Sequence, residues 1–260
     1  MSYFAAIALI VTSTLVAGLA AWLVGAVLSI DTRRRHHEVG GQVFQQVGVM
    51  VSVLMAFVFS EVWGEYRTAA MAINGECGAL HGAAMLAGAL PGGAGLPVER
   101  GIATYVATVM NTEWPLMATR HSSPLAVHQF ESLLQQAANL PLARPVDAAN
   151  QAQIVSLLTQ AHAFRETRTF ELTQGMPMLM WIMLIGISVV LMGFVVFAGL
   201  DNPGHLIFAC AFTAFTACTV LVLVLVRMLD FPFEGALALS SADFGKLLGE
   251  VTVLARGGAP

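Results

Sequence analysis

Charged side chains are scarce in this chain of 260 residues. Asp, Glu, Lys and Arg together make up 11% of the sequence, less than half of their share in an average soluble domain, whereas hydrophobic residues make up 57%. So few ionised groups cannot cover a water-facing surface, which excludes an ordinary soluble enzyme. Lysine occurs once, as Lys246, and the net charge is −4. The chain therefore lacks the basic surface by which proteins bind nucleic acid.

Cysteine is also scarce, with three residues in the whole sequence. Cys210 and Cys218 lie in one apolar run, about two helical turns apart, which is too far for a disulfide within one helix. Cys77 has no nearby partner in the sequence, so a disulfide framework is excluded. The uncharged N-terminal run of 30 residues lacks a basic leader and is too long for a cleaved signal peptide, so we expect a retained anchor.

Long apolar runs dominate what the sequence does contain. A helix that crosses a bilayer needs about 20 consecutive apolar residues, and four uncharged stretches are long enough. They predict four transmembrane helices, at residues 1–30, 39–63, 176–200 and 206–228. The segments between and after these spans are predicted to be a basic loop at 31–38, a tight Asn-Pro-Gly turn at 201–205, and a C-terminal tail at 229–260 with a short amphipathic helix.

Residues 64–175, between the second and third spans, carry many of the acidic and arginine residues. Helical spacing of apolar residues continues past Trp63, so we expect the second span to extend out of the membrane until the Gly/Pro-rich run 91–97. Further helical segments follow, and we expect Pro115 to kink or stop one of them. The predicted fold class is therefore all-α: a polytopic membrane protein with four transmembrane helices and a helical extramembrane bundle between the second and third.

The arginine distribution bears on orientation. Arg33, Arg34 and Arg35 crowd the first loop, and the positive-inside rule favours a cytoplasmic position for such a loop. Four spans put both termini and residues 64–175 on the same side, which we then expect to be extracytoplasmic. Arginines near the opposite span ends argue for the reverse orientation.

A stripe of small and polar residues follows one face of the second span. It consists of Gln45, Gly48, Ser52, Ala56 and Ser60, which are spaced by three, four or seven residues and so share a helix face. Lipid does not favour such a face. The small-polar face therefore predicts a water-lined pore surface in an oligomer. The alternative is close packing against other helices through small residues, with glutamine amides bonded across helices.

Two carboxylates, Glu61 and Glu65, stand at the end of the second span. Carboxylates at membrane level are functional candidates, and repeated around a symmetric oligomer they would form a ring that attracts cations. The alternative is a solvated helix end, where either glutamate pairs with Arg67, Arg165 or Arg168.

The segment Glu113-Trp114-Pro115 indicates a corner of the helical bundle. We expect Trp114 to pack, Pro115 to break the helix, and Glu113 to bond a neighbouring helix end or an arginine.

Arg165 and Arg168 lie two to three turns before the third span. They are expected to pair with acids across the bundle, or alternatively to contact lipid phosphates. Asp230, near Arg227, follows the fourth span in an apolar turn. Glu113, Trp114 and these two arginines are, with Asp230, our candidates for structural or gating roles.

Three segments carry a resemblance to a known family: His37-Glu38-Val39-Gly40-Gly41, Glu113-Trp114-Pro115, and Asp230-x-Pro232-Phe233-x-Gly235. In these segments and in its layout of helices, the chain resembles the bestrophin-like domain family of mostly bacterial membrane proteins. The resemblance covers nearly the whole chain from residue 37. It implies kinship with bestrophins, which are pentameric anion channels with four spans per subunit and a helical region between the second and third.

The resemblance further implies a homo-oligomer, a pentamer by analogy, in a bacterial plasma membrane, with the lipid bilayer and ions as partners. The tail departs from bestrophins because it holds only scattered acids, Asp230, Glu234 and Asp243, where an acidic calcium-binding cluster would stand. Calcium gating is therefore not implied.

Motifs of enzymes and cofactor sites are not found in the sequence. It holds no nucleophile elbow, phosphate-binding loop or HExxH pair, and His36 and His37 would point about 100° apart on a helix, which makes them poor joint metal ligands. We therefore predict no enzyme activity, no cofactor and no metal. The favoured function is an oligomeric ion-conducting pore lined by the second span. The alternative is a non-conducting membrane scaffold or sensor whose helical region binds a protein partner.

Overall fold

The computed structural model describes residues 2–27, 37–141, 144, 147–199 and 205–255, and these are helical apart from short turns and loops. The predicted all-α class is confirmed. The chain divides into two compact units. The membrane unit comprises Met1–Gly64 and Gly175–Asp230, and the bundle unit comprises Glu65–Gln174 and Phe231–Pro260. The arginine-rich loop, the side chains of His36 and His37, and the predicted Asn-Pro-Gly turn lie outside the part whose placement is described.

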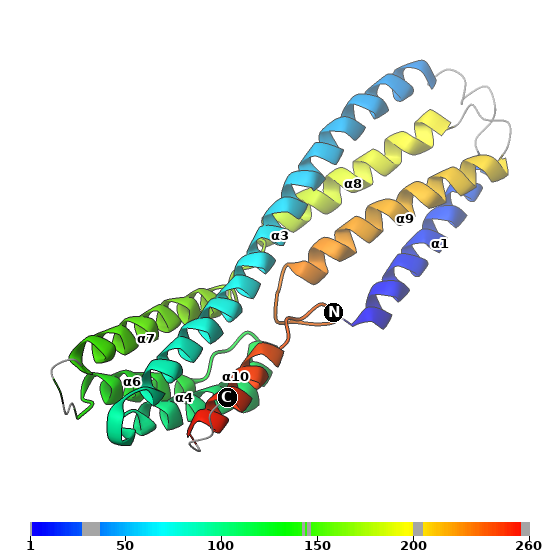
Figure 1. The fold of residues 1–260 in the computed structure, drawn as a ribbon. Coiled ribbons are helices and arrows are strands. Elements are labelled where there is room, and N and C mark those ends of the chain that lie inside the picture. Colours follow the sequence, from blue (N-terminus) through cyan, green and yellow to red (C-terminus); the bar gives the residue numbers. More distant parts are fainter. Residues whose placement is uncertain (1, 28–36, 142–143, 145–146, 200–204, 256–260) are drawn as a thin grey trace. The chain divides into compact units, whose positions relative to one another are not determined.

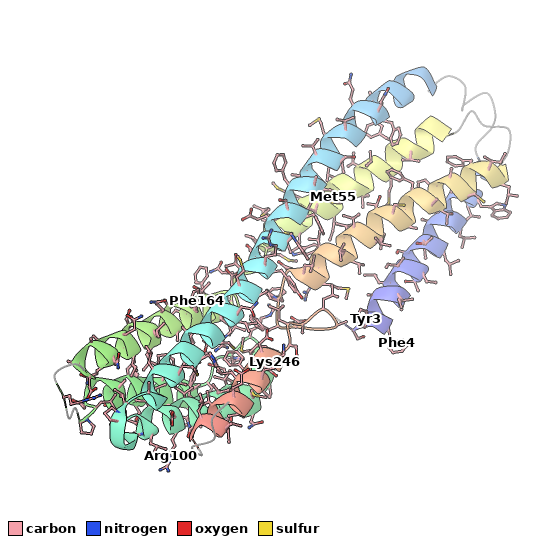
Figure 2. The ribbon with its side chains drawn as sticks, viewed as in Figure 1. Tyr3, Phe4, Met55, Arg100, Phe164 and Lys246 are labelled. Carbon is pink, nitrogen blue, oxygen red and sulfur yellow. The ribbon has the colours of Figure 1, made fainter. Side chains whose placement is uncertain are left out.

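The membrane unit contains four helices that are long and apolar enough to cross a bilayer (Figure 1). They are α1 (Tyr3–Val27), the first part of α3 (His37–Gly88), α8 (Met178–Gly199) and α9 (His205–Leu229). Large apolar side chains such as Phe4 project outward from them (Figure 2). Helices of this composition satisfy their backbone hydrogen bonds internally, as a bilayer requires.

Within the membrane unit, α1 packs along α9. Ala21 on α1 is buried together with Phe208 and Phe212 on α9. A methyl group added at Gly18 would lie 2.7 Å from the Thr213 hydroxyl, so the absence of a side chain there permits the close approach of the two helices.

The bundle unit surrounds the second part of α3 with shorter helices. These are α4 (Leu96–Thr108), the π-turn η2 (Val109–Glu113), α5 (Trp114–Met117), α6 (Pro124–Ala138), α7 (Asp147–Phe170) and α10 (Ala242–Ala255). The helix α10 packs on α4, α4 on α6, and α6 on α7. Their buried side chains form one core that includes Leu80, Ile102, Phe130, Leu158 and Phe244.

Helix α6 shows how sequence sets this packing. Ser123 precedes it in extended conformation, and its hydroxyl accepts a hydrogen bond from the backbone N–H of Ala126, which caps the helix. Apolar residues then recur at three- and four-residue intervals, so Ala126, Phe130, Leu133 and Ala137 all face the core.

The Gly/Pro-rich run ends α3, as its chemistry requires. After Gly88 the chain turns through the 3-10 segment η1 (Pro91–Gly93), where Gly92 and Gly93 have φ of 67° and 72°. This left-handed backbone strains other residues but not glycine. Gly95 then lies against the backbone of Ala87 and starts α4.

Pro115 does not break the helix at its own position, because a π-turn that ends at Glu113 stands just before it. Val109–Glu113 form the wider π-turn, and α5 continues with Pro115 in its first turn. Proline lacks an N–H and its ring collides with a carbonyl four residues earlier in a regular helix. We infer that the extra residue of the π-turn accommodates the ring and lets the helix run on to Met117.

Candidate functional site

The small-polar stripe of α3 is largely uncovered by the chain's own helices. Gln45, Ser52, Ala56 and Ser60 are exposed, and Gly48 is half-buried. The Ser52 hydroxyl donates a hydrogen bond to the Gly48 carbonyl at 2.8 Å, so it needs no outside partner. This face is therefore open to water, lipid or another molecule.

One edge of the stripe faces a cavity inside the membrane unit. Gly48 and Ser52 line a space of about 260 Å³ with Leu191 of α8 and Phe215 of α9. The helix-packing interpretation thus has support at this end of the stripe. Ala56 and Ser60 do not line that cavity.

The carboxylates of Glu61 and Glu65 lie on another face of α3 than the stripe. Glu61 is exposed and Glu65 is half-buried. Successive residues of an α-helix are rotated by about 100°, so Glu61 is turned away from Ser60 by that angle, and Glu65 follows Glu61 one turn later. A surface formed by the stripe therefore includes neither Glu61 nor Glu65.

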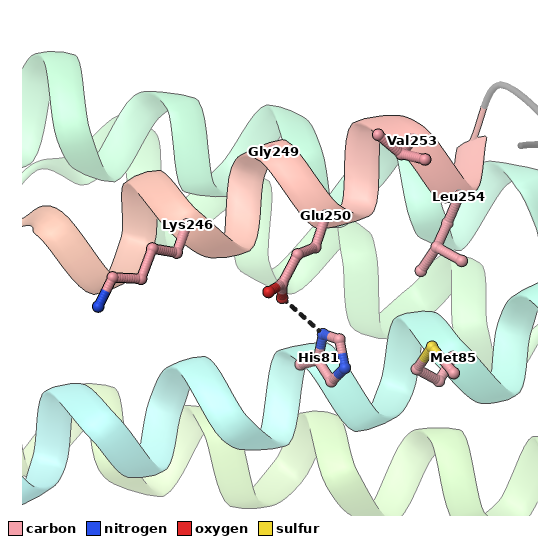
Figure 3. Close-up of a pocket in the computed structure, with 7 residues that line it drawn as sticks. All are labelled: His81, Met85, Lys246, Gly249, Glu250, Val253 and Leu254. Atoms are coloured by element: carbon pink, nitrogen blue, oxygen red, sulfur yellow. Dashed lines mark ion pairs between the residues drawn. The ribbon is translucent and has the colours of Figure 1, made fainter. Parts of the chain in front are cut away.

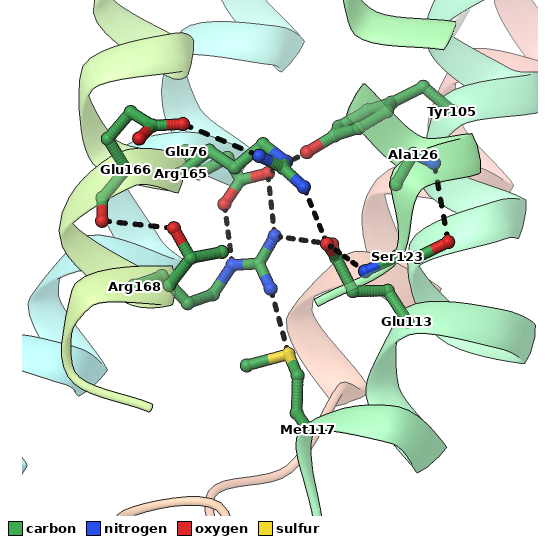
Figure 4. A network of polar contacts seen from close by, with 10 residues as sticks. Glu76, Tyr105, Glu113, Met117, Ser123, Ala126, Arg165, Glu166 and Arg168 are labelled. Atoms are coloured by element: carbon green, nitrogen blue, oxygen red, sulfur yellow. Dashed lines mark hydrogen bonds and ion pairs between the residues drawn. The ribbon is translucent and has the colours of Figure 1, made fainter. Parts of the chain in front are cut away.

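A dense cluster of polar side chains lies in the core of the bundle unit (Figure 4). Arg168 is fully buried, and its Nε donates to Glu76 Oε2 at 2.8 Å. Its Nη2 donates to Glu76 Oε1 at 3.3 Å and to Glu113 Oε2 at 3.1 Å, while Nη1 contacts Met117 Sδ at 3.0 Å. One guanidinium thus joins α3, the π-turn and α7.

Glu113 is the second centre of the cluster. Its Oε1 accepts from Arg165 Nη2 at 2.6 Å and from the backbone N–H of Ser123 at 3.3 Å. It therefore bonds both an arginine and the start of α6. On the far side, the Tyr105 hydroxyl donates to Glu76 Oε1 at 2.5 Å. Two buried acids face two buried arginines, so the cluster is electrically balanced.

The surroundings shift the pKa values of Arg168 and Tyr105 in this cluster. Burial, the largest single influence, lowers the pKa of Arg168, but the charge and hydrogen bond of Glu76 together with Tyr105 and the charge of Glu113 outweigh it, so the pKa is raised and the guanidinium stays charged. Burial, reinforced by Glu76, raises the pKa of Tyr105 well above its ordinary value, so its phenol remains a donor. With all members buried and bonded, the arrangement suits a structural core and not a reactive site.

Trp114 packs beside this cluster. Its ring meets those of Phe233 and Phe244 edge-to-face, with centroids 5.7 Å apart in each pair. The Arg168 guanidinium lies 5.8 Å from the Trp114 ring centre and 5.5 Å from that of Phe244. The aromatic group thus closes one side of the buried arginine.

Glu76 and Tyr105 were not predicted from the sequence, where Arg165 and Arg168 had several possible acid partners. A signal existed: Glu76 is spaced by seven residues from Ala69 and from Ala83, so it lies on a face of small apolar residues. A lone acid on a core face needs a cationic partner. The sequence around Glu76 does not indicate that this partner is Arg168, which lies 92 positions away.

Asp230 acts at the end of the membrane unit. It is 2% exposed, and its Oδ1 accepts a hydrogen bond from the backbone N–H of Met176 at 2.8 Å. Met176 lies just before α8, so the carboxylate caps the approach to that helix, where the helix dipole favours a negative charge.

A tight crevice in the bundle unit holds another buried carboxylate. Glu171, directly after α7, lies with Arg120 and the Phe231–Glu234 turn around a crevice too narrow for water. Arg120 stacks on Phe231 at 3.4 Å and pairs with Glu234 at 2.9 Å. Glu171 is 8% exposed and forms no side-chain hydrogen bond or ion pair with any residue that the structure describes. Burial raises its pKa, and the charge of Glu65 raises it further.

Glu171→Gln is therefore expected to stabilise the protein at neutral pH. Because the folded state raises the pKa of Glu171, it binds the proton more tightly than the unfolded state. The resulting stabilisation is complete below the ordinary carboxyl pKa of about 4.3 and is lost as pH rises through the raised value. The advantage of the variant should thus shrink on acidification. Thermal unfolding across pH checks this, with exposed Glu131→Gln as control. An equal gain at every pH would contradict it.

An open groove of about 620 Å³ runs between α3 and α10 (Figure 3). His81 of α3 and Glu250 of α10 face each other across it, with Nδ1 and Oε2 3.1 Å apart. Apolar side chains, including Met85 and Val253, form much of its lining. Among the described residues, no three His, Cys, Asp or Glu side chains converge as a metal site would require.

Comparison with known proteins gives a consistent answer. The model of the Bestrophin-like domain family matches residues 11–244. A crystal structure of a bacterial bestrophin homolog from Klebsiella pneumoniae has a TM-score of 0.75 at 12% identity, covering 96% of this chain and 100% of that chain. Another crystal structure, of a membrane protein variant, has a TM-score of 0.76 at 14% identity, with 96% and 100% covered. At such identities the likeness concerns the fold. No curated protein sequence matches.

Proposed function

Because the chain belongs to the bestrophin-like domain family, we propose that it forms a homo-oligomeric ion-conducting pore in a bacterial plasma membrane, lined by α3. The observation that carries the proposal is the exposed stripe of Gln45, Ser52, Ala56 and Ser60 on a helix long enough to cross the bilayer. By analogy with bestrophins, the oligomer contains five copies.

The chemistry of the stripe supports this role. In a closed symmetric ring each copy presents the same helix face to the axis. Small side chains leave room there, and the hydroxyl and amide groups can replace part of the water around a passing ion. Glu61 and Glu65, at the end of the span, would add negative potential near the mouth without facing the axis with the stripe.

Flux through reconstituted protein tests the proposal directly. Purified oligomer in liposomes should release a trapped salt gradient faster than empty liposomes do. An intact oligomer with no flux at any pH or voltage would overturn the proposal and favour a non-conducting scaffold.

A bulky side chain on the stripe should block conduction. Ala56→Phe is expected to abolish most of the flux, because every copy would push a phenyl ring toward the axis. Leu54→Phe is the matched control, since Leu54 is exposed on a different face of the same span. Flux assays on both variants, with oligomer size checked by chromatography, decide the matter. Equal loss in both, or none in either, would remove the stripe from the pore.

A further inference from the structure

The stripe of α3 does not end with the membrane span. The structure has α3 as one helix from His37 to Gly88. Seven residues make about two turns, so positions seven apart share a face with a drift of about 20°. Counting from Ser60, the same face carries Arg67, Asn74 and His81. Arg67 is thus the first charged residue on the face that the stripe defines.

This continuation is as open as the stripe itself. Arg67 and Asn74 are exposed, whereas Ala69, Ala72 and Ile73 turn into the core. A methyl group added at Gly78, on the same open side, would meet nothing within 4 Å. No acid in the part of the chain that the structure describes forms an ion pair with Arg67.

The groups on this face share one chemical character. Arg67 offers a permanent positive charge and five N–H donors, Asn74 an amide and Ser60 a hydroxyl. At its far end His81 faces Glu250, with Lys246 along the same groove (Figure 3), so the charge there is offset. The uncompensated charge on the face is the guanidinium of Arg67.

We propose that Arg67 is the residue that determines ion selectivity. The inference rests on the proposed function. In a ring of copies whose α3 stripes face the axis, the guanidinium groups form a cationic girdle that concentrates small inorganic anions and repels cations. Focusing of this kind changes local ion concentration by about tenfold or more. The carboxylate of Glu61, on another face, contributes much less.

Reversal potentials in asymmetric NaCl test this assignment on full-length protein in bilayers. Arg67→Gln should lower the chloride-to-sodium permeability ratio by about tenfold, and Arg67→Glu should reverse the preference. Arg100→Glu, a charge change of the same size at an exposed arginine on α4 (Figure 2), should leave the ratio unchanged, and Glu61→Gln should change it far less than Arg67→Gln does. Conduction with a ratio insensitive to Arg67 overturns the assignment alone. An intact oligomer that conducts nothing overturns the proposed function and this inference together.

A second measurement does not require conduction. Asn74→Cys, in a background where Cys77, Cys210 and Cys218 are replaced by alanine, places one thiol seven residues beyond Arg67. An anionic methanethiosulfonate should modify it faster than a cationic one, and Arg67→Gln should reduce that rate ratio by about tenfold. An unchanged ratio would show that Arg67 does not govern the potential on this face.

Discussion

Arg168→Met is expected to lower the free energy of unfolding by about 3–5 kcal/mol, which is enough to abolish folding of a marginally stable protein. The substitution keeps much of the side-chain volume but removes the charge that holds Glu76 and Glu113. Both carboxylates are fully buried, and Arg165 alone would then have to compensate two negative charges. Thermal unfolding followed by circular dichroism on the full chain in detergent measures the loss.

Two further variants separate charge from packing. Arg168→Met combined with Glu76→Gln restores charge balance, because Glu113 and Arg165 remain as one pair, so the double variant should lose less stability than the single one. Arg100→Met, at an exposed arginine, should change stability by less than about 0.5 kcal/mol. A double variant that is less stable than Arg168→Met would argue against an electrostatic origin.

Gly95→Ala should be nearly as damaging, by about 3 kcal/mol. The added methyl group would fall inside the backbone of Ala87, near the end of α3, and backbone atoms cannot rotate away as a side chain does. The carbonyl of Gly95 also accepts the first hydrogen bonds of α4, from Val98 and Glu99, so a shift of this residue disturbs that helix as well.

The matched control for this change is Gly249→Ala on α10. There an added methyl group meets nothing within 4 Å, and alanine favours a helix over glycine by up to about 1 kcal/mol. The two glycine-to-alanine changes should therefore shift the melting temperature in opposite directions. A neutral Gly95→Ala would mean that the turn between α3 and α4 relaxes easily.

The spans and the long α3 could be predicted because their causes are local. A bilayer demands apolar length, and helical spacing past Trp63 is visible in the sequence. The partners of Arg165 and Arg168 could not, since ion pairs between residues 52 and 92 positions apart leave no periodic trace. Glu61 stands at the same span end as Ser60, but one step along a helix changes the face, so closeness in sequence does not place it with the stripe.

Pro115 shows how neighbouring residues can offset the helix-breaking effect of a proline. Proline does disfavour a regular helix, yet the π-turn at Val109–Glu113 widens the helix just before Pro115 and lets it continue to Met117. Sequence rules for proline describe a single residue. In this chain the π-turn that accommodates Pro115 involves a full turn of residues, so no single position in the sequence predicts it.

The π-turn has a consequence for comparing this chain with its relatives. Such a turn is an α-helix with one residue inserted, so a relative that lacks one residue between Thr108 and Trp114 need not have a shorter loop. Its helix would instead be rotated by about 100° beyond that point, and Glu113 would leave Arg165 and Arg168. A one-residue gap in an alignment at this place thus means that the buried partner of the two arginines has changed. We expect such a gap only in relatives in which Arg165 and Arg168 are also replaced.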